Sequence, residues 1–196
     1  MGFLPADIGG PLLPGRASYD PATKRYTLTS ANYNIWCFRD ESRYAWKKVS
    51  GDVSLAADVI FPDAQGYFDR KAVLVIRQDL DDNAKEIMTA LHGGGLIHLA
   101  RRSNKGADLQ EASRIEAKDN PAGPVPTRLG IEKRGDSFQL YVSLLGEPMH
   151  AVGAPVTLKI DGPFYVGLGF CSHVPEKSDT TVLANVVLEN AAGRVK

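Results

Sequence analysis

The amino-acid sequence predicts an all-β fold, built as a sandwich or a barrel of short antiparallel strands. Apolar residues recur at every second position in most segments, helical periodicity is weak, and Gly- or Pro-rich turns separate the segments. These turns are Asp20-Pro21, Ser50-Gly51-Asp52, Gly93-Gly94-Gly95 and Asp161-Gly162-Pro163. We therefore expect helix in fewer than about 10% of residues, against roughly 30–35% in an average globular protein.

The first half of the chain contains several strand patterns. Residues 52–61 alternate between apolar and polar side chains, as in a half-buried strand. Residues 71–79, KAVLVIRQD, form a nearly continuous apolar run, which is typical of a central strand. Residues 96–102 alternate less cleanly, because His98 stands between two apolar neighbours. Residues 81–91 fit either a strand or a turn or two of helix.

The second half continues the same pattern. Residues 127–146 predict a β-hairpin that turns at Arg134-Gly135-Asp136. Residues 163–173 alternate again and place His173 on the face opposite the large apolar side chains. Residues 180–190 predict the last strand.

The length of the chain suits one substantial domain, so we expect a single domain over residues 1–196. The Pro-rich segment 119–127 is interpreted as a loop that crosses between two sheets, because strand patterns resume directly after it. Cys37 and Cys171 lie among aromatic or apolar neighbours, which favours two buried free thiols over a disulfide.

The charge balance limits the classes of partner. Lys and Arg total 23 and Asp and Glu total 23, so the basic excess of a nucleic-acid-binding protein is missing and we expect no nucleic-acid partner. No segment approaches the ~18 consecutive apolar residues of a membrane span, so we expect no membrane partner. The first 15 residues lack the pattern of a signal peptide. The sequence indicates neither a compartment nor an oligomeric state.

Four segments carry a resemblance to a known family. They are DIGGPLLPG at 7–15, YNIWCFRDESRYAWKKVSGD at 33–52, KAVLVIRQD at 71–79, and GFCSH with the closing TTVLANVVLEN. In their order and spacing the chain resembles the concanavalin A-like lectin/glucanase superfamily. Within it, the chain is most similar to a branch that includes regulation-of-enolase-like domains.

The resemblance implies a jelly-roll sandwich of two antiparallel sheets, one of which has a concave outer face where relatives hold carbohydrate. It also implies that a structural calcium ion could lie near the termini, with Asp7 and either Asn185 or Glu189 as ligands, although Asp7 can equally cap the N-terminal turn. The family often has Asp-Ile-Trp where this chain has Asn34-Ile35-Trp36, which weakens any role that needs a carboxylate at position 34. We expect no cofactor.

Aromatic and polar side chains supply the candidate binding residues. Trp36 and Trp46 offer flat rings on which the apolar face of a sugar can stack, and the alternative is that they fill the core. Arg77 ends an apolar strand and can bind vicinal hydroxyls, or it can form a structural ion pair with Asp40.

The histidines complete the predicted site. His92, His98 and His173 lie in or beside strands, but no His-x-His or His-Glu-x-x-His spacing supports a metal site. The predicted ligand-binding residues, expected to form one cluster on the concave sheet, are Trp36, Asp40, Trp46, Arg77, His92 and His173.

These patterns favour a non-catalytic carbohydrate- or glycan-binding module. The alternatives are a carbohydrate-active enzyme, either a glycoside hydrolase or a lyase, and a protein-interaction domain. Retaining glucanases of this fold carry closely spaced acidic residues on one strand, and this pattern is missing here. The HGGGL segment at 92–96 is similar to an esterase oxyanion-hole motif, but without a serine elbow it predicts a glycine-rich hairpin turn.

Overall fold

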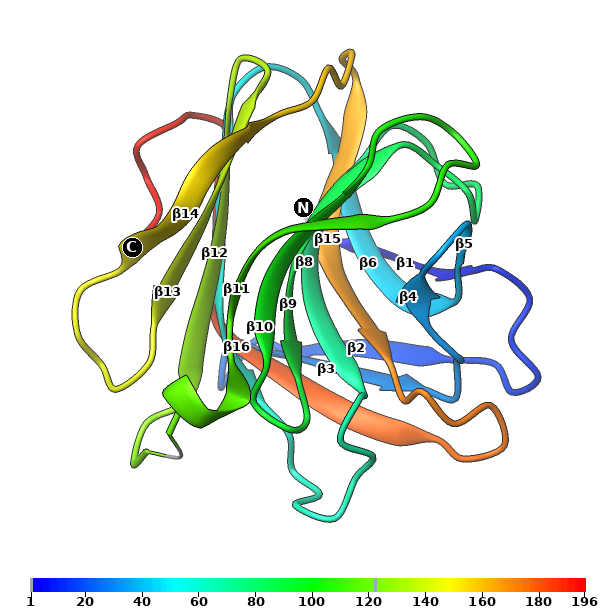
Figure 1. Ribbon diagram of the computed structural model, residues 1–196. Coiled ribbons are helices and arrows are strands. Elements are labelled where there is room, and N and C mark those ends of the chain that lie inside the picture. Colours follow the sequence, from blue (N-terminus) through cyan, green and yellow to red (C-terminus); the bar gives the residue numbers. More distant parts are fainter. Residues whose placement is uncertain (1, 122) are drawn as a thin grey trace.

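Two antiparallel sheets of seven strands each pack face to face in the computed structural model, which describes residues 2–121 and 123–196 (Figure 1). Sheet A runs in the order β1 (Leu4–Ile8), β6 (Ser42–Val49), β15 (Phe164–Cys171), β8 (Lys71–Arg77), β9 (Glu86–His92), β10 (Ile97–Arg102) and β11 (Gln110–Ile115). Sheet B runs in the order β14 (His150–Thr157), β13 (Ser137–Ser143), β12 (Thr127–Arg134), β7 (Val53–Ile60), β16 (Asp179–Glu189), β3 (Arg25–Ser30) and β2 (Arg16–Asp20).

Two small elements complete the described part of the chain. Strands β4 (Ile35–Trp36) and β5 (Arg39–Asp40) form a short hairpin outside both sheets, and η1 (Ala117–Asp119) is a single 3-10 turn. Within the described residues η1 is the only helical segment, so the predicted all-β sandwich with little helix is confirmed. Those residues also include no helix with the length and apolar character to cross a bilayer.

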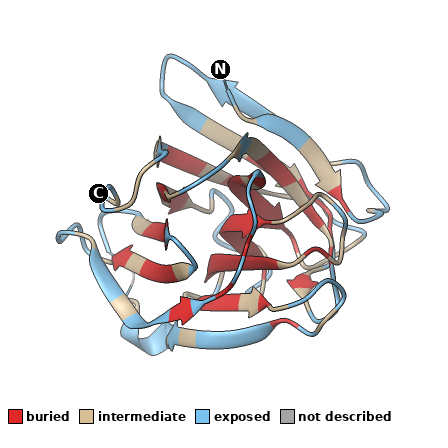
Figure 2. Cartoon of the chain, turned by 90° about the horizontal axis from the view of Figure 1, so that it is seen from above, coloured by how far each residue is buried: buried red, intermediate tan, exposed pale blue. Residues whose placement is uncertain are grey.

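The core lies between the sheets because each strand turns its large apolar side chains inward. Leu74 and Ile76 on β8 meet Leu55 on β7 and Ile131 on β12, and all of them are fully buried. Figure 2 shows buried residues along the central strands, whereas the edge strands β2, β11 and β14 are mostly exposed.

Most predicted elements appear where the sequence places them. The hairpin at 127–146 is β12 and β13, and the Pro-rich segment joins β11 of sheet A to β12 of sheet B, with position 122 outside the described residues. The ambiguous segment 81–91 contains a strand, β9, rather than a helix. The HGGGL segment turns the chain between β9 and β10, as predicted, with the His92 N–H donating to the carbonyl of Leu96 (2.8 Å).

The prediction of two buried thiols is half wrong. Both cysteines are free, but only Cys171 is buried, whereas Cys37 is exposed at the tip of the β4–β5 hairpin. Cys37 has a positive φ of 55° and lies in the turn between β4 and β5, outside both large sheets.

The β4–β5 hairpin covers a second apolar cluster on the outer face of sheet A. Ile35 packs there with Val73, Val75 and Met88 from the sheet. The hairpin is fastened by its backbone: the Asp40 N–H donates to the carbonyl of Asp82 (2.7 Å), and the Cys37 carbonyl accepts from Leu109 (2.9 Å). The hairpin is therefore attached as a cover over this apolar cluster.

Candidate functional site

Polar side chains form two rows on the outer face of sheet A, one at each end of strands β8, β9 and β10. At one end Arg77 and Arg102 both lie opposite Glu86. At the other end Lys71 lies opposite His92, and His98 of β10 stands nearby. The apolar side chains of Val73, Val75, Met88, Ala90 and Ala100 separate the rows.

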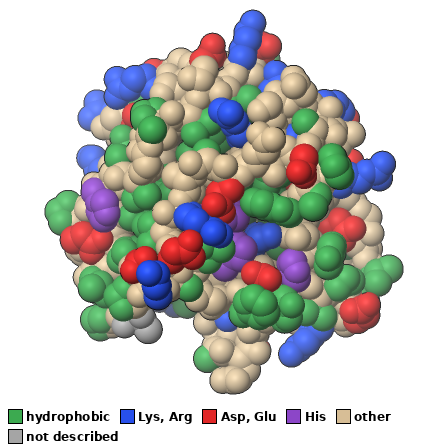
Figure 3. Space-filling model, viewed as in Figure 1, with side chains coloured by type: hydrophobic (Ala, Val, Ile, Leu, Met, Phe, Trp, Pro, Cys, Tyr) green, Lys and Arg blue, Asp and Glu red, His purple; other side chains and the backbone are tan. Residues whose placement is uncertain are grey.

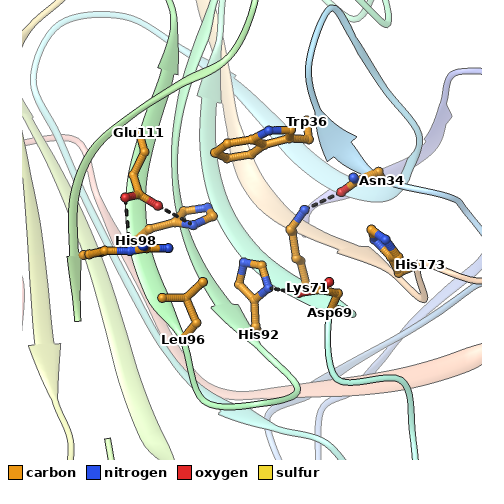
Figure 4. A pocket seen from close by; sticks show the side chains of 10 residues that line it. Asn34, Trp36, Asp69, Lys71, His92, Leu96, His98, Glu111 and His173 are labelled. Carbon is orange, nitrogen blue, oxygen red and sulfur yellow. Dashed lines mark hydrogen bonds and ion pairs between the residues drawn. The ribbon is translucent and has the colours of Figure 1, made fainter. Parts of the chain in front are cut away.

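The second row forms the floor of a pocket with a volume of about 220 Å³ (Figure 4). In Figure 3 histidine, acidic and basic side chains gather near the centre of this face, with hydrophobic side chains around them. The residues that line the pocket are Asn34, Trp36, Asp69, Lys71, His92, Leu96, His98, Glu111, Arg114 and His173.

Two histidines on the floor are each accompanied by a carboxylate. The Nδ1 atom of His92 lies 3.2 Å from Oδ1 of Asp69. Because a carboxylate only accepts, Nδ1 of His92 carries the proton and Nε2 is left as an acceptor. The Nδ1 atom of His98 lies 3.6 Å from Oε2 of Glu111, which is too long for a hydrogen bond. The two imidazole rings meet edge to face, 5.0 Å apart.

These imidazoles have nitrogen atoms that no described residue binds. Nε2 of His92, both ring nitrogens of His98 and Nδ1 of His173 are buried without a hydrogen-bond partner in the described part of the chain. Buried polar atoms are normally paired, so these ring nitrogens are available to bind water or a ligand.

Burial keeps the histidines neutral at neutral pH. It lowers the pKa of His92 to about 4, an effect that Lys71 increases and Asp69 opposes. The pKa of His98 is lowered well below its usual value by burial and by His92, and burial also lowers the pKa of His173. Neutral imidazoles can both donate and accept hydrogen bonds, which suits a ligand rich in hydroxyl groups.

Lys71 stands among these rings and is itself buried, with 3% of its surface exposed. Its ammonium group donates to Oδ1 of Asn34 and lies 5.4 Å from the centre of the Trp36 ring. Burial lowers the pKa of Lys71. In Figure 4 the Lys71 ammonium group points at Asn34, between the rings of Trp36 and His92.

Aromatic rings form the roof and rim of the pocket. The Trp36 ring lies over His98, with ring centres 5.3 Å apart. His173 is stacked on Tyr67 at 5.3 Å and lies 5.1 Å from Tyr33, and both tyrosines are exposed. The pocket therefore combines a polar floor with an aromatic border.

The loop that carries Tyr67 and Asp69 is held in place by Arg70. The Arg70 guanidinium pairs with Asp179 (2.7 Å) and donates to the Asp63 carbonyl (2.6 Å). The Phe68 carbonyl accepts from Gly94 (2.7 Å) in the glycine-rich turn before β10. The rim is thus positioned by both a buried ion pair and the backbone.

The structure brings together three of the six predicted site residues. Trp36, His92 and His173 line the pocket. Trp46 lies on β6, where its ring packs edge-on against Tyr165 (5.0 Å) and borders a separate groove with Leu4. The Trp36 ring instead lies by Lys71 of β8 and His98 of β10, and β8 is two strand spacings, about 10 Å, from β6.

Asp40 and Arg77 lie at the arginine end of these strands, away from the pocket. They form a structural ion pair, which was the alternative to ligand binding in the sequence analysis. Oδ2 of Asp40 lies 3.2 Å from Arg77, and its Oδ1 lies 2.7 Å from Arg102. Glu86 lies 3.6 Å from Arg77 and 3.4 Å from Arg102. All four side chains are at most 2% exposed, so they are closed off from a ligand.

Sequence reasoning did not include Lys71, Asn34 or Glu111 among the ligand-binding residues. Lys71 begins the apolar strand β8 and shares strand parity with Arg77, which was a usable signal. Glu111 lies on an edge strand and Asn34 precedes a two-residue strand, and neither has a distinctive local pattern.

Within residues 2–121 and 123–196, no group of three or more His, Cys, Asp or Glu side chains is placed to hold a metal. For the calcium ligands that the resemblance implied, Asp7 pairs with Arg43 (3.1 Å), and the Asn185 amide donates to Asp58 (2.6 Å). Asp7 therefore has a cationic partner within the protein.

Comparison with known proteins identifies the fold. No family model matches the chain, and no curated protein matches it in sequence. A functionally unknown protein from Saccharomyces cerevisiae has a TM-score of 0.65 at 14% identity, over 96% of this chain and 97% of that one. The carbohydrate-binding module CBM66 from Bacillus subtilis has a TM-score of 0.55 at 13% identity, over 94% of each chain.

A third similar structure is the carbohydrate recognition domain of Emp47p. Its TM-score is 0.59 at 12% identity, over 97% of this chain and 89% of that one. The fold is a concanavalin A-like jelly roll. At these identities the likeness concerns the fold alone, and it confirms the jelly-roll prediction.

Proposed function

We propose that this chain, acting as one domain, is a non-catalytic glycan-binding module whose site is the pocket on the outer face of sheet A. One observation carries this proposal: unpaired, neutral imidazole nitrogens line the floor of a pocket whose roof is the indole of Trp36. The assignment to the regulation-of-enolase-like branch is part of the same proposal.

The chemistry of a sugar ring matches this arrangement. Its C–H faces are apolar and stack on aromatic rings, whereas its hydroxyl groups both donate and accept hydrogen bonds. In the pocket Nε2 of His92 can accept and Lys71 can donate, and the Trp36 ring lies over Lys71 and His98. The similar structures add support, because two of them are described as a carbohydrate-binding module and a carbohydrate recognition domain.

The test is a glycan array followed by titration of the best ligand. We expect wild-type protein to bind, and His92→Ala to lose at least about tenfold in affinity because it removes a buried acceptor. His150→Ala is the matched control, since His150 is exposed on β14 of sheet B and should bind like wild type. Equal binding by His92→Ala and wild type, or an array without hits, would overturn the proposal.

A carbohydrate-active enzyme is the second candidate, and the Asp69–His92 pair favours it. A carboxylate that holds Nδ1–H leaves Nε2 free to act as a general base. Product formation from an oligosaccharide that disappears in both His92→Ala and Asp69→Asn would establish this candidate in place of the binding module.

We expect no hydrolysis of common β-glucans in the same assays. Retaining hydrolysis needs two carboxyl groups about 5–5.5 Å apart. The pocket carboxylates instead come from Asp69, just before β8, and Glu111 on β11, and these two strands are three strand spacings apart, about 14 Å.

A further inference from the structure

Lys71 is a buried ammonium group without an ionic partner. Among the described residues, no carboxylate oxygen lies within 4.0 Å of its Nζ atom, and its one hydrogen bond goes to the neutral amide of Asn34. An ammonium group has three donors, so two of them are left for a ligand. We infer that the pocket binds a sugar unit with one negative charge, and specifically the carboxylate of a uronic acid, an inference that rests on the proposed function.

The other charged side chains that line the pocket already have partners within the protein. Asp69 accepts from His92, and Glu111 lies 3.1 Å from Arg114. Arg114 also lies 3.3 Å from Glu116, so this cation has two carboxylates of its own. Lys71 is therefore the charge in the pocket lining that a ligand can balance.

A second buried lysine shows the contrasting case. Lys133 on β12 is 5% exposed, donates to the Gly135 carbonyl (2.7 Å) and lies over the rings of Phe138 and Phe164. No carboxylate of the described residues lies within 4.0 Å of its ammonium group either, but this group lies between the two sheets, over Phe138 of β13 and Phe164 of β15, and does not line the pocket of Lys71. Lys71 differs because its free donors face a cavity.

The rest of the lining favours a uronate over other anions. Asp69 and Glu111 lie in the same pocket and would repel a dianionic phosphate more strongly than a monoanion. The acceptor Nε2 of His92 requires a donor on the ligand, which a sugar hydroxyl supplies and a bare carboxylate ion does not. A uronic acid carries both the anion for Lys71 and the hydroxyls for the imidazole.

Asn34 offers a sharp test of this inference. Asn34→Asp has nearly the same shape and places a carboxylate at the position that Lys71 already contacts. The ammonium group then has an internal partner and no longer favours an anionic ligand. Lys71→Met removes the charge while keeping most of the side-chain length, and Lys133→Met is the matched control at the enclosed lysine.

The experiment is titration calorimetry with oligosaccharides of glucuronic, galacturonic and mannuronic acid, their methyl esters, and sulfate esters of the corresponding neutral sugars. We expect one uronate series to bind wild type at least about tenfold more tightly than its methyl ester. Asn34→Asp and Lys71→Met should abolish this preference, whereas Lys133→Met should keep it. Thermal melts should show Lys71→Met at least as stable as wild type, because it removes a buried charge.

The contrary outcomes are distinct. Equal binding of uronates and methyl esters overturns the inference and leaves the proposed function standing. Tighter binding of a sulfate ester than of any uronate overturns the carboxylate assignment. Failure of every charged and neutral sugar to bind overturns the proposed function and the inference with it. A large loss of stability in Lys71→Met overturns the role of Lys71 as a charge that is kept for a ligand.

Discussion

The two ends of strands β8, β9 and β10 carry similar side chains but have opposite environments. At one end the guanidinium groups of Arg77 and Arg102 are bound by Asp40 and lie beside Glu86, without access to solvent. At the other end Lys71 and the imidazoles of His92 and His98 line a pocket and have free polar atoms. The same sheet thus has a closed polar row and an open one.

The β4–β5 hairpin makes the difference. It brings Asp40 over the arginine row, where a carboxylate can balance the positive charges. It brings Trp36 over the lysine and histidine row, where an indole shields the polar atoms but accepts no conventional hydrogen bond from them. The same hairpin therefore completes the ion-pair network of one row and leaves polar atoms of the other row without partners among the described residues.

Removing Asp40 is expected to have the largest effect on the closed row. Asp40→Ala leaves two buried guanidinium groups with only Glu86 beside them, and breaking such a buried pair costs about 3–5 kcal/mol of unfolding free energy. The matched variant in the open row is Asp69→Ala, whose carboxylate is 37% exposed and should cost less than about 1 kcal/mol. Urea denaturation measures both, and equal losses would contradict the distinction between the rows.

Acid is expected to destabilise the open row. The pKa of His92 is about 4 in the folded protein and about 6.5 when unfolded, so the unfolded chain binds the proton first as the pH falls. Stability should therefore decrease between about pH 6.5 and 4, by roughly 3 kcal/mol from this residue. In the variant His92→Gln this part of the pH dependence should disappear.

The closed row should respond in the opposite direction. Burial, with Asp40 adding to it, raises the pKa of Glu86, so the folded state binds a proton that the unfolded state releases. This contribution to stability is lost as the pH rises through the folded pKa, and Glu86→Gln should remove it. Denaturation midpoints measured from pH 4 to 9 for both variants would separate the two rows, and identical pH profiles would contradict the assignment.

The two tryptophans provide the smallest expected effect. Trp36→Ala should reduce glycan affinity by about 1–3 kcal/mol, because the indole covers the open row. Trp46→Ala should leave affinity unchanged and lower the melting temperature, because its ring packs on Tyr165 outside the pocket. Loss of affinity in Trp46→Ala with none in Trp36→Ala would move the site to the groove beside β1.

The strand content could be predicted because alternation along a strand is a local property. Strands β7, β8, β12 and β13 each follow from their own apolar pattern, since burial of one face requires a period of two. Exposure of Cys37 was not predictable in this way. The residue has apolar neighbours in sequence, but it forms the turn of a hairpin that lies outside both sheets.

The site was only partly predictable, because its residues come from segments far apart in the chain. Trp36, His92 and His173 were identified by residue type, and Asp40 and Arg77 were selected by the same criterion although they satisfy each other. Residue type indicates what a side chain can bind. It does not indicate whether the protein itself already supplies the partner.

The sequence by itself determined that this protein is built of short antiparallel strands, since periodicity acts along the chain, and the resemblance to a known superfamily implied that they form a sandwich. Only the tertiary structure decided which charged side chains stay available. Asp40 reaches Arg77 and Arg102 across 37 and 62 residues of sequence, while the amide of Asn34 leaves Lys71 without an ionic partner. Charges are neutralised by proximity in space, and the placement of the β4–β5 hairpin sets that proximity.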